Sequence, residues 1–76
     1  MIPETPTELV KGVRKFHGWS QADLAELLGV HVMTVSRWER GLPHQMSMST
    51  KILLVILYNA NPEVVAEAKE EALKLR

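Results

Sequence analysis

The residues of this chain that could take part in chemistry gather between Lys11 and His44. This stretch contains five basic residues, three acidic residues and all three histidines of the chain. The basic residues are Lys11, Arg14, Lys15, Arg37 and Arg40, and the acidic residues are Asp23, Glu26 and Glu39. Such side chains supply charge and hydrogen bonds, which serve recognition as readily as catalysis.

Catalysis or metal binding would require a different arrangement of these residues. His17, His31 and His44 lack a ligand spacing such as two histidines four residues apart on a helix. The chain has no cysteine, which excludes a disulfide or a thiolate zinc site and suits a reducing compartment. There is also no glycine-rich phosphate loop and no nucleophile motif. We therefore expect no enzymatic activity, no metal and no cofactor, and a cytoplasmic protein.

The stretch from Gln21 to Gly41 predicts two short helices joined by a tight turn. Ser20 and Asp23 form a capping box for the first helix, and Gly29 is suited to the left-handed backbone that ends it. Apolar residues recur at helical spacing on both sides of this turn, at Leu24, Ala25, Leu28, Val35 and Trp38. This pattern is a helix-turn-helix.

One face of the second motif helix is left over once the core positions are subtracted. This helix is expected to run from His31 or Val32 to Arg40, with Gly41 ending it. The outer face then consists of His31, Val32, Met33, Thr34, Ser36, Arg37 and Arg40. A partner would touch this face.

Three further helices are predicted around the motif. The first runs from about Pro6 to His17 after a capping box at Thr5. The fourth is capped by Ser47 and carries the apolar run 52–58, for which a buried strand is the alternative. The last begins at Asn61 and Pro62, and its apolar stripe either packs on the fourth helix or forms a dimer contact.

Length and charge restrict the interpretation further. A chain of 76 residues is expected to form one domain, residues 1–76, around a modest core. No signal peptide is evident, and the run 52–58 is far shorter than the roughly 20 residues that span a bilayer. Nine Lys plus Arg balance nine Asp plus Glu. This zero net charge argues weakly against a nucleic-acid partner.

The residues of the motif resemble a known family. The segments 21–25, 28–30 and 35–41 are similar to the Cro/repressor-type (XRE-like) helix-turn-helix proteins, which include phage repressors and antitoxins. The resemblance implies an all-α, five-helix, lambda-repressor-like domain with the motif at its second and third helices. It also implies a regulator that binds double-stranded DNA, most simply a repressor on a two-fold operator.

The resemblance assigns base reading to four residues of the outer face. These are Val32, Met33, Ser36 and Arg37, which match positions that reach base edges in the major groove. Arg37 could bond guanine O6 and N7 together, with a phosphate contact as the alternative. Val32 and Met33 could contact a thymine methyl group or exclude other bases by shape, and a buried position is the alternative for Met33.

The same resemblance assigns phosphate contacts around this face. The matching residues are Arg14, Gln21, His31, Thr34, Arg40 and His44. Arg14 and Glu39 match a pair that often forms an ion pair between the first helix and the recognition helix. For Gln21 the alternative is an ordinary exposed residue, and His31, a poor N-cap by type, has a purely solvated position as its alternative.

Dimer formation is expected through the last two helices, because one recognition helix covers only a few base pairs. The candidate contacts are Leu54, Leu57, Tyr58 and Val65. The alternative is a monomer in solution, with the last helix folded over the fourth. A rival function is a protein-interaction module or an antitoxin that uses the same fold to bind a toxin or another protein.

Overall fold

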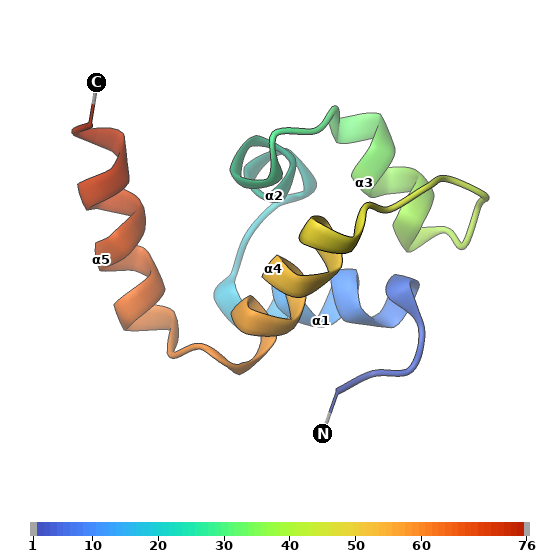
Figure 1. The fold of residues 1–76 in the computed structure, drawn as a ribbon, viewed down its shortest axis with the longest axis horizontal. Coiled ribbons are helices and arrows are strands. Elements are labelled where there is room, and N and C mark those ends of the chain that lie inside the picture. The colour runs from blue at the N-terminus through green and yellow to red at the C-terminus, as the bar shows by residue number, and fades with distance from the viewer. Residues whose placement is uncertain (1, 76) are drawn as a thin grey trace.

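The computed structural model describes residues 2–75, which form five helices (Figure 1). They are α1 (Pro6–His17), α2 (Gln21–Leu28), α3 (Val32–Glu39), α4 (Met48–Asn59) and α5 (Pro62–Leu73). The all-α, five-helix prediction is confirmed. Residues 52–58 lie within α4, so the alternative of a buried strand is wrong.

Local sequence signals explain where most of these helices begin and end. At α2, the Ser20 hydroxyl accepts from Asp23 N and the Asp23 carboxylate accepts from Ser20 N, both at 3.0 Å. These bonds from Ser20 lower the pKa of the Asp23 carboxyl. Gly29 ends the helix with φ of 70°, a left-handed conformation that costs glycine little. Thr5, Ser47 and Asn61 cap α1, α4 and α5 by accepting one backbone N–H each, from Glu8, Thr50 and Glu63, so the capping box predicted at Thr5 is formed in one direction only.

The hydrophobic core is built entirely from the first four helices. α1 crosses both α3 and α4, and α2 packs against α3. The buried apolar residues are Leu9, Val10, Val13, Leu24, Ala25, Val35, Trp38, Leu54 and Leu57. This bundle therefore holds α3 in place from behind and leaves its other side to solvent.

Two close contacts fix how α1 lies on α4. A Cβ atom added to Gly12 would stand 2.8 Å from Cε2 of Tyr58, so glycine allows the ring to lie against the α1 backbone. At the end of α1, Nε2 of His17 lies 2.7 Å from the Leu57 carbonyl oxygen. The His17 ring also stacks on Trp19, with 4.5 Å between ring centroids.

Helix α5 stands apart from the other four helices (Figure 1). None of its residues is buried, and of its described apolar residues only Val65 packs against the core. Val64 and Leu73 remain 61% and 71% exposed. Of the two alternatives for the apolar stripe of α5, packing on α4 is therefore realised only in part, because Val65 reaches the core while a groove remains between α5 and α4.

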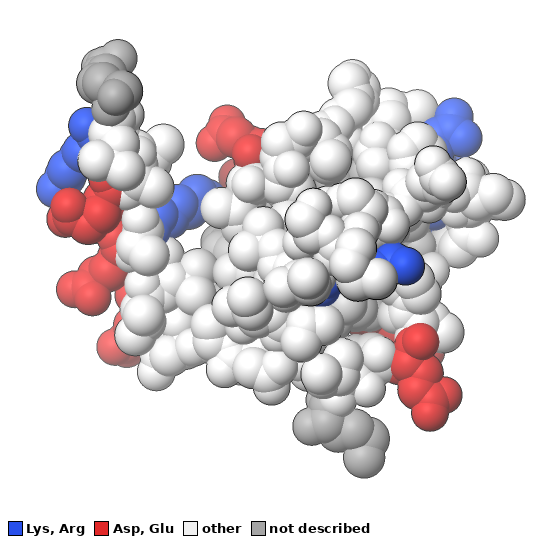
Figure 2. Space-filling model, in the orientation of Figure 1, with Lys and Arg blue, Asp and Glu red and all other residues white. Residues whose placement is uncertain are grey.

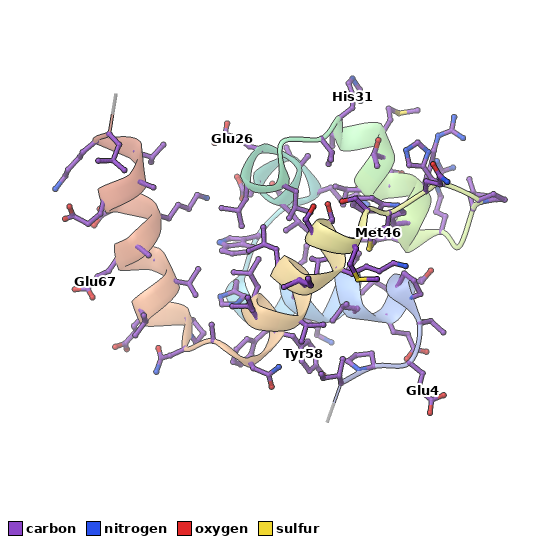
Figure 3. The ribbon with its side chains drawn as sticks, viewed as in Figure 1. Glu4, Glu26, His31, Met46, Tyr58 and Glu67 are labelled. Atoms are coloured by element: carbon purple, nitrogen blue, oxygen red, sulfur yellow. The ribbon has the colours of Figure 1, made fainter. Side chains whose placement is uncertain are left out.

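This groove between α5 and the bundle is apolar and open, with a volume of about 300 Å³. Its lining comes from α2, α4 and α5 and consists of Leu27, Leu53, Leu57, Val64, Val65, Ala68, Lys69 and Ala72. The outer side of α5 is acidic, and Glu67 points from it away from the bundle (Figure 3). Helix α5 thus has an acidic outer face and an apolar inner face.

Candidate nucleic-acid interface

The outer face of α3 is presented to solvent as predicted from the motif. Val35, Trp38 and Glu39 turn inward and are buried. On the opposite side Met33 is 49% exposed and Arg37 is also exposed, because residues four apart share one face of a helix. The alternative of a buried Met33 is therefore wrong. Val32 is 39% exposed at the edge of this face, and Ser36 is half-buried.

An ion pair behind α3 fixes its orientation relative to α1. Arg14 donates from Nε to Oε2 of Glu39 at 2.5 Å and from Nη2 to Oε1 at 2.8 Å. Gln21 at the start of α2 donates to the same Oε1 at 3.1 Å. The predicted pair of Arg14 with Glu39 is thus confirmed, and it joins three helices at one carboxylate.

The electrostatics of Glu39 follow from these bonds. Burial alone would raise the pKa of its carboxyl, but the hydrogen bonds from Arg14 and then Gln21 outweigh burial and lower it. The hydrogen bond to Glu39 in turn raises the pKa of Arg14. Both groups are therefore charged at neutral pH, and the carboxylate positions α3 without offering a proton.

A second set of bonds holds the C-terminal end of α3. Thr7 on α1 donates from Oγ1 to the Trp38 carbonyl oxygen at 2.6 Å. The Trp38 indole N–H donates to the carbonyl oxygen of His44 at 3.2 Å, which ties the loop after α3 to the core. The sequence alone does not indicate these partners, although a buried indole N–H generally requires an acceptor.

His31 begins α3 in a way that its residue type did not indicate. Its Nδ1 accepts from the Met33 backbone N–H at 3.0 Å, so His31 is the N-cap of the helix. The expectation of a poor cap is corrected. A ring that accepts at Nδ1 in its neutral form carries its proton on Nε2. The exposed ring projects from the start of α3, so this N–H is available to an acceptor outside the chain (Figure 3).

The predicted phosphate contacts fall into two groups. His31, Arg40 and His44 are exposed and Thr34 is half-buried, all on α3 or in the segments that flank it. Arg14 instead uses three of its five N–H groups within the chain, two on Glu39 and one on the Trp19 carbonyl. Gln21 is similarly engaged. These two side chains position α3 first, and their phosphate contacts stay predictions.

The predicted dimer contacts require a correction. Leu54 is fully buried and Leu57 is only 6% exposed, so both belong to the core of the chain itself. Tyr58 and Val65 are half-buried. The exposed apolar residues of α4 are Met48, Ile52, Leu53 and Ile56. Helix α4 lies on the side of the molecule seen in Figures 1 and 2, and most of the surface around it is uncharged.

Helices α2 and α3, joined by the tight turn at Gly29, form a helix-turn-helix in which one face of α3 is exposed. The family description Helix-turn-helix (HTH_3) matches residues 10–61 of the 76. The chain therefore belongs to the Cro/C1-type helix-turn-helix family, the XRE family, whose members bind double-stranded DNA as regulators. Searches of curated proteins and of solved structures give no match.

The extent of the family match adds one fact to the geometry. It begins within α1 and ends at Asn61, immediately before α5. It therefore includes all of α2, α3 and α4. None of the helices formed by residues 2–75 has the length and apolar character needed to cross a membrane.

Proposed function

We propose that this protein is a sequence-specific repressor that inserts α3 into the major groove of its operator. The observation that carries the proposal is the outer face of α3, where Met33 and Arg37 are exposed and Ser36 is half-buried, while Glu39 and Trp38 anchor the helix from behind. An anchored helix can hold its side chains in register with base edges, which direct readout requires.

Arg37 is the main base-reading residue in this proposal. It is exposed, and it lies one turn beyond Met33 on the same face. Its guanidinium can donate two parallel hydrogen bonds to guanine O6 and N7. His31, Thr34, Arg40 and His44 flank this position and would bind phosphates on either side. The neutral net charge does not exclude this contact, because Arg37 and Arg40 are exposed on α3 and at its end.

Repression is the simplest regulatory outcome for such a protein. A repressor needs only to occupy its operator, whereas an activator must also contact the transcription machinery. The proposed operator has two-fold symmetry, with half-sites about 34–36 Å apart, because one α3 covers too few base pairs for specificity.

The second copy of the chain would bind through the apolar side of α4 and α5. Ile52 and Ile56 are 54% and 57% exposed and lie one turn apart on α4. Leu53 and Val64 continue this surface into the apolar groove beside α5. A two-fold contact covers the same patch on both copies, so each of these residues would be buried in both chains of the dimer. Tyr58 and Val65 remain candidate contacts at its edge.

A protein partner is the competing function for the same surface. The open apolar groove between α5 and the bundle would suit an antitoxin that binds a toxin there. In that case the apolar side of α4 and α5 would face the toxin, and the outer face of α3 would make little contribution to binding. DNA affinity would then be weak and insensitive to Arg37.

DNA titrations at several salt concentrations test the proposal. The logarithm of the affinity should fall linearly with the logarithm of the salt concentration, by roughly 0.9 for each phosphate contacted. On a site selected from random duplexes, Arg37→Ala should cost about 1–3 kcal/mol and relax the preference at one base pair. Lys74→Ala removes an equal charge from the end of α5 and should leave binding unchanged.

Two results would contradict parts of this proposal. Equal losses for Arg37→Ala on selected and random DNA would make Arg37 a phosphate contact. If the wild-type protein sediments as a free monomer and binds one half-site as tightly as two, the dimer is wrong.

A further inference from the structure

We infer that the DNA site of this protein carries C5-methyl groups of thymine opposite Val32 and Met33, and that these methyl groups are part of what it reads. The inference rests on the proposed function, because it concerns the bases that α3 would face. It adds the chemical class of the bases next to the one bonded by Arg37.

Two neighbouring apolar side chains are exposed in the first turn of α3. Val32 is 39% and Met33 is 49% exposed, while the other described apolar residues of this helix, Val35 and Trp38, are buried. A valine offers no hydrogen bond, and a methionine offers only a weakly accepting sulfur. Neither side chain can therefore satisfy the amino, keto or ring nitrogen groups of a base edge.

The backbone of this turn does not make up for the missing donors. The Met33 N–H is bonded to Nδ1 of His31 at 3.0 Å, and the Thr34 N–H to the His31 carbonyl at 2.9 Å. Pressing Val32 and Met33 against a purine or cytosine edge would thus leave polar base atoms without partners, which is costly. The C5-methyl group of thymine is the apolar group that the major groove presents.

The spacing of the face places these methyl groups relative to the guanine. Arg37 follows Met33 by four residues, and Ser36 follows Val32 by four. Four residues of helix advance by about 6 Å, close to two base steps of about 3.4 Å each. The expected site therefore has thymines within about two base pairs of the guanine bonded by Arg37.

Replacing thymine by deoxyuridine tests the inference, because uracil keeps every hydrogen-bonding group and lacks only the methyl group. A site is first selected from random duplexes, and each thymine is then replaced singly. Removing one buried methyl group should weaken binding about fourfold, with no effect at thymines elsewhere in the site. A second selection, from duplexes with 5-methylcytosine in place of cytosine, tests whether that base is the preferred source of the methyl group.

Variants of Met33 assign the effect to the protein. Met33→Gln should abolish the difference between thymine and uracil at one position, because an amide gains nothing from a methyl group. Met33→Leu keeps an apolar side chain and should retain the difference. Met33 is 49% exposed, so circular dichroism should show the same helix content for both variants as for the wild type.

The outcomes separate this inference from the proposed function. Salt-dependent binding to a selected site that is equally tight with thymine and uracil would overturn the methyl readout and leave DNA binding in place. Enrichment of 5-methylcytosine over thymine opposite Met33 would overturn the choice of thymine. The absence of any salt-dependent DNA binding would overturn both.

Discussion

Helices α4 and α5 have the same length of 12 residues, yet the molecule uses them in opposite ways. α4 places Leu54 and Leu57 in the core, while no residue of α5 is buried. The difference follows from side-chain size, since the apolar residues of α5 include three alanines, whose burial stabilises much less than that of leucine. The number of apolar positions on a helix does not decide whether it joins a core.

The same contrast separates the bundle of α1–α4 from α5. The four helices that share the core are those that the family match includes in whole or in part, whereas α5 lies beyond Asn61. The bundle of α1–α4 has the contacts needed to hold α3, whereas α5 adds exposed apolar residues to those of α4. We therefore expect changes in the bundle to affect stability and changes in α5 to affect assembly.

The largest effect is expected from Trp38→Ala. This change removes a buried indole from between α1 and α3 together with its bond to the His44 carbonyl, and should cost about 3–5 kcal/mol of unfolding free energy. Denaturant unfolding measures this loss. In α5, Leu73→Ala alters a side chain that is 71% exposed and should stay within about 0.5 kcal/mol of wild type. Similar losses for both variants would contradict the view that α1–α4 hold the stability and α5 adds little to it.

Glu39→Gln should have the next largest effect, about 1–3 kcal/mol at neutral pH. It leaves Arg14 with a neutral acceptor, and the loss is moderated because the Arg14 side chain is 27% exposed. Thermal unfolding at pH 7 is a sufficient measurement. Glu67→Gln, on the exposed side of α5, is the matched control and should change little.

The pH dependence of stability provides a separate signature of Glu39. Its pKa in the folded protein lies below the ordinary value of 4.5, so near and below that pH the unfolded chain binds more protons. The stabilisation is therefore complete above about pH 5 and is lost as the pH falls through the pKa of the folded state. Asp23, whose pKa is also lowered, adds to the same trend. The wild type should lose more stability on acidification than Glu39→Gln does.

The sequence predicted the features that depend on neighbouring residues. The starts of α1, α2, α4 and α5 follow from caps at Thr5, Ser20, Ser47 and Asn61, because a capping side chain bonds to backbone groups only two or three residues away. Trp38 was correctly predicted to be buried, and its spacing from Val35 indicated the inner face of α3.

Features that depend on how helices cross could not be predicted in the same way. The bond from Thr7 to the Trp38 carbonyl joins residues 31 positions apart. The run 52–58 is apolar on every side, so periodicity could not show that Leu54 faces the core while Ile52 and Ile56 face solvent. That ambiguity led to the incorrect assignment of Leu54 and Leu57 as dimer contacts.

Removing α5 tests directly whether the bundle of α1–α4 is stable by itself, and a smaller loss of stability is expected. A chain ending at Asn61 keeps every buried core residue and should lose only about 1 kcal/mol of stability, because Val65 alone packs on the core. It should unfold cooperatively and bind two half-sites little better than one. If the shortened chain does not fold, α5 belongs to the stable unit and the division between the two regions is wrong.

The smallest effect is expected at the contact of α5 with the segment before α2. Lys69 places Nζ 5.4 Å from the centroid of the Trp19 ring, a cation–π contact worth about 0.5 kcal/mol when partly exposed. Lys69→Met keeps the aliphatic stem against the groove and removes only the charge. A double-mutant cycle with Trp19→Leu isolates the pair from the stacking of Trp19 on His17. A coupling energy well above 1 kcal/mol would mean that α5 is anchored to the bundle through Trp19. The groove beside it would then be a fixed part of the fold.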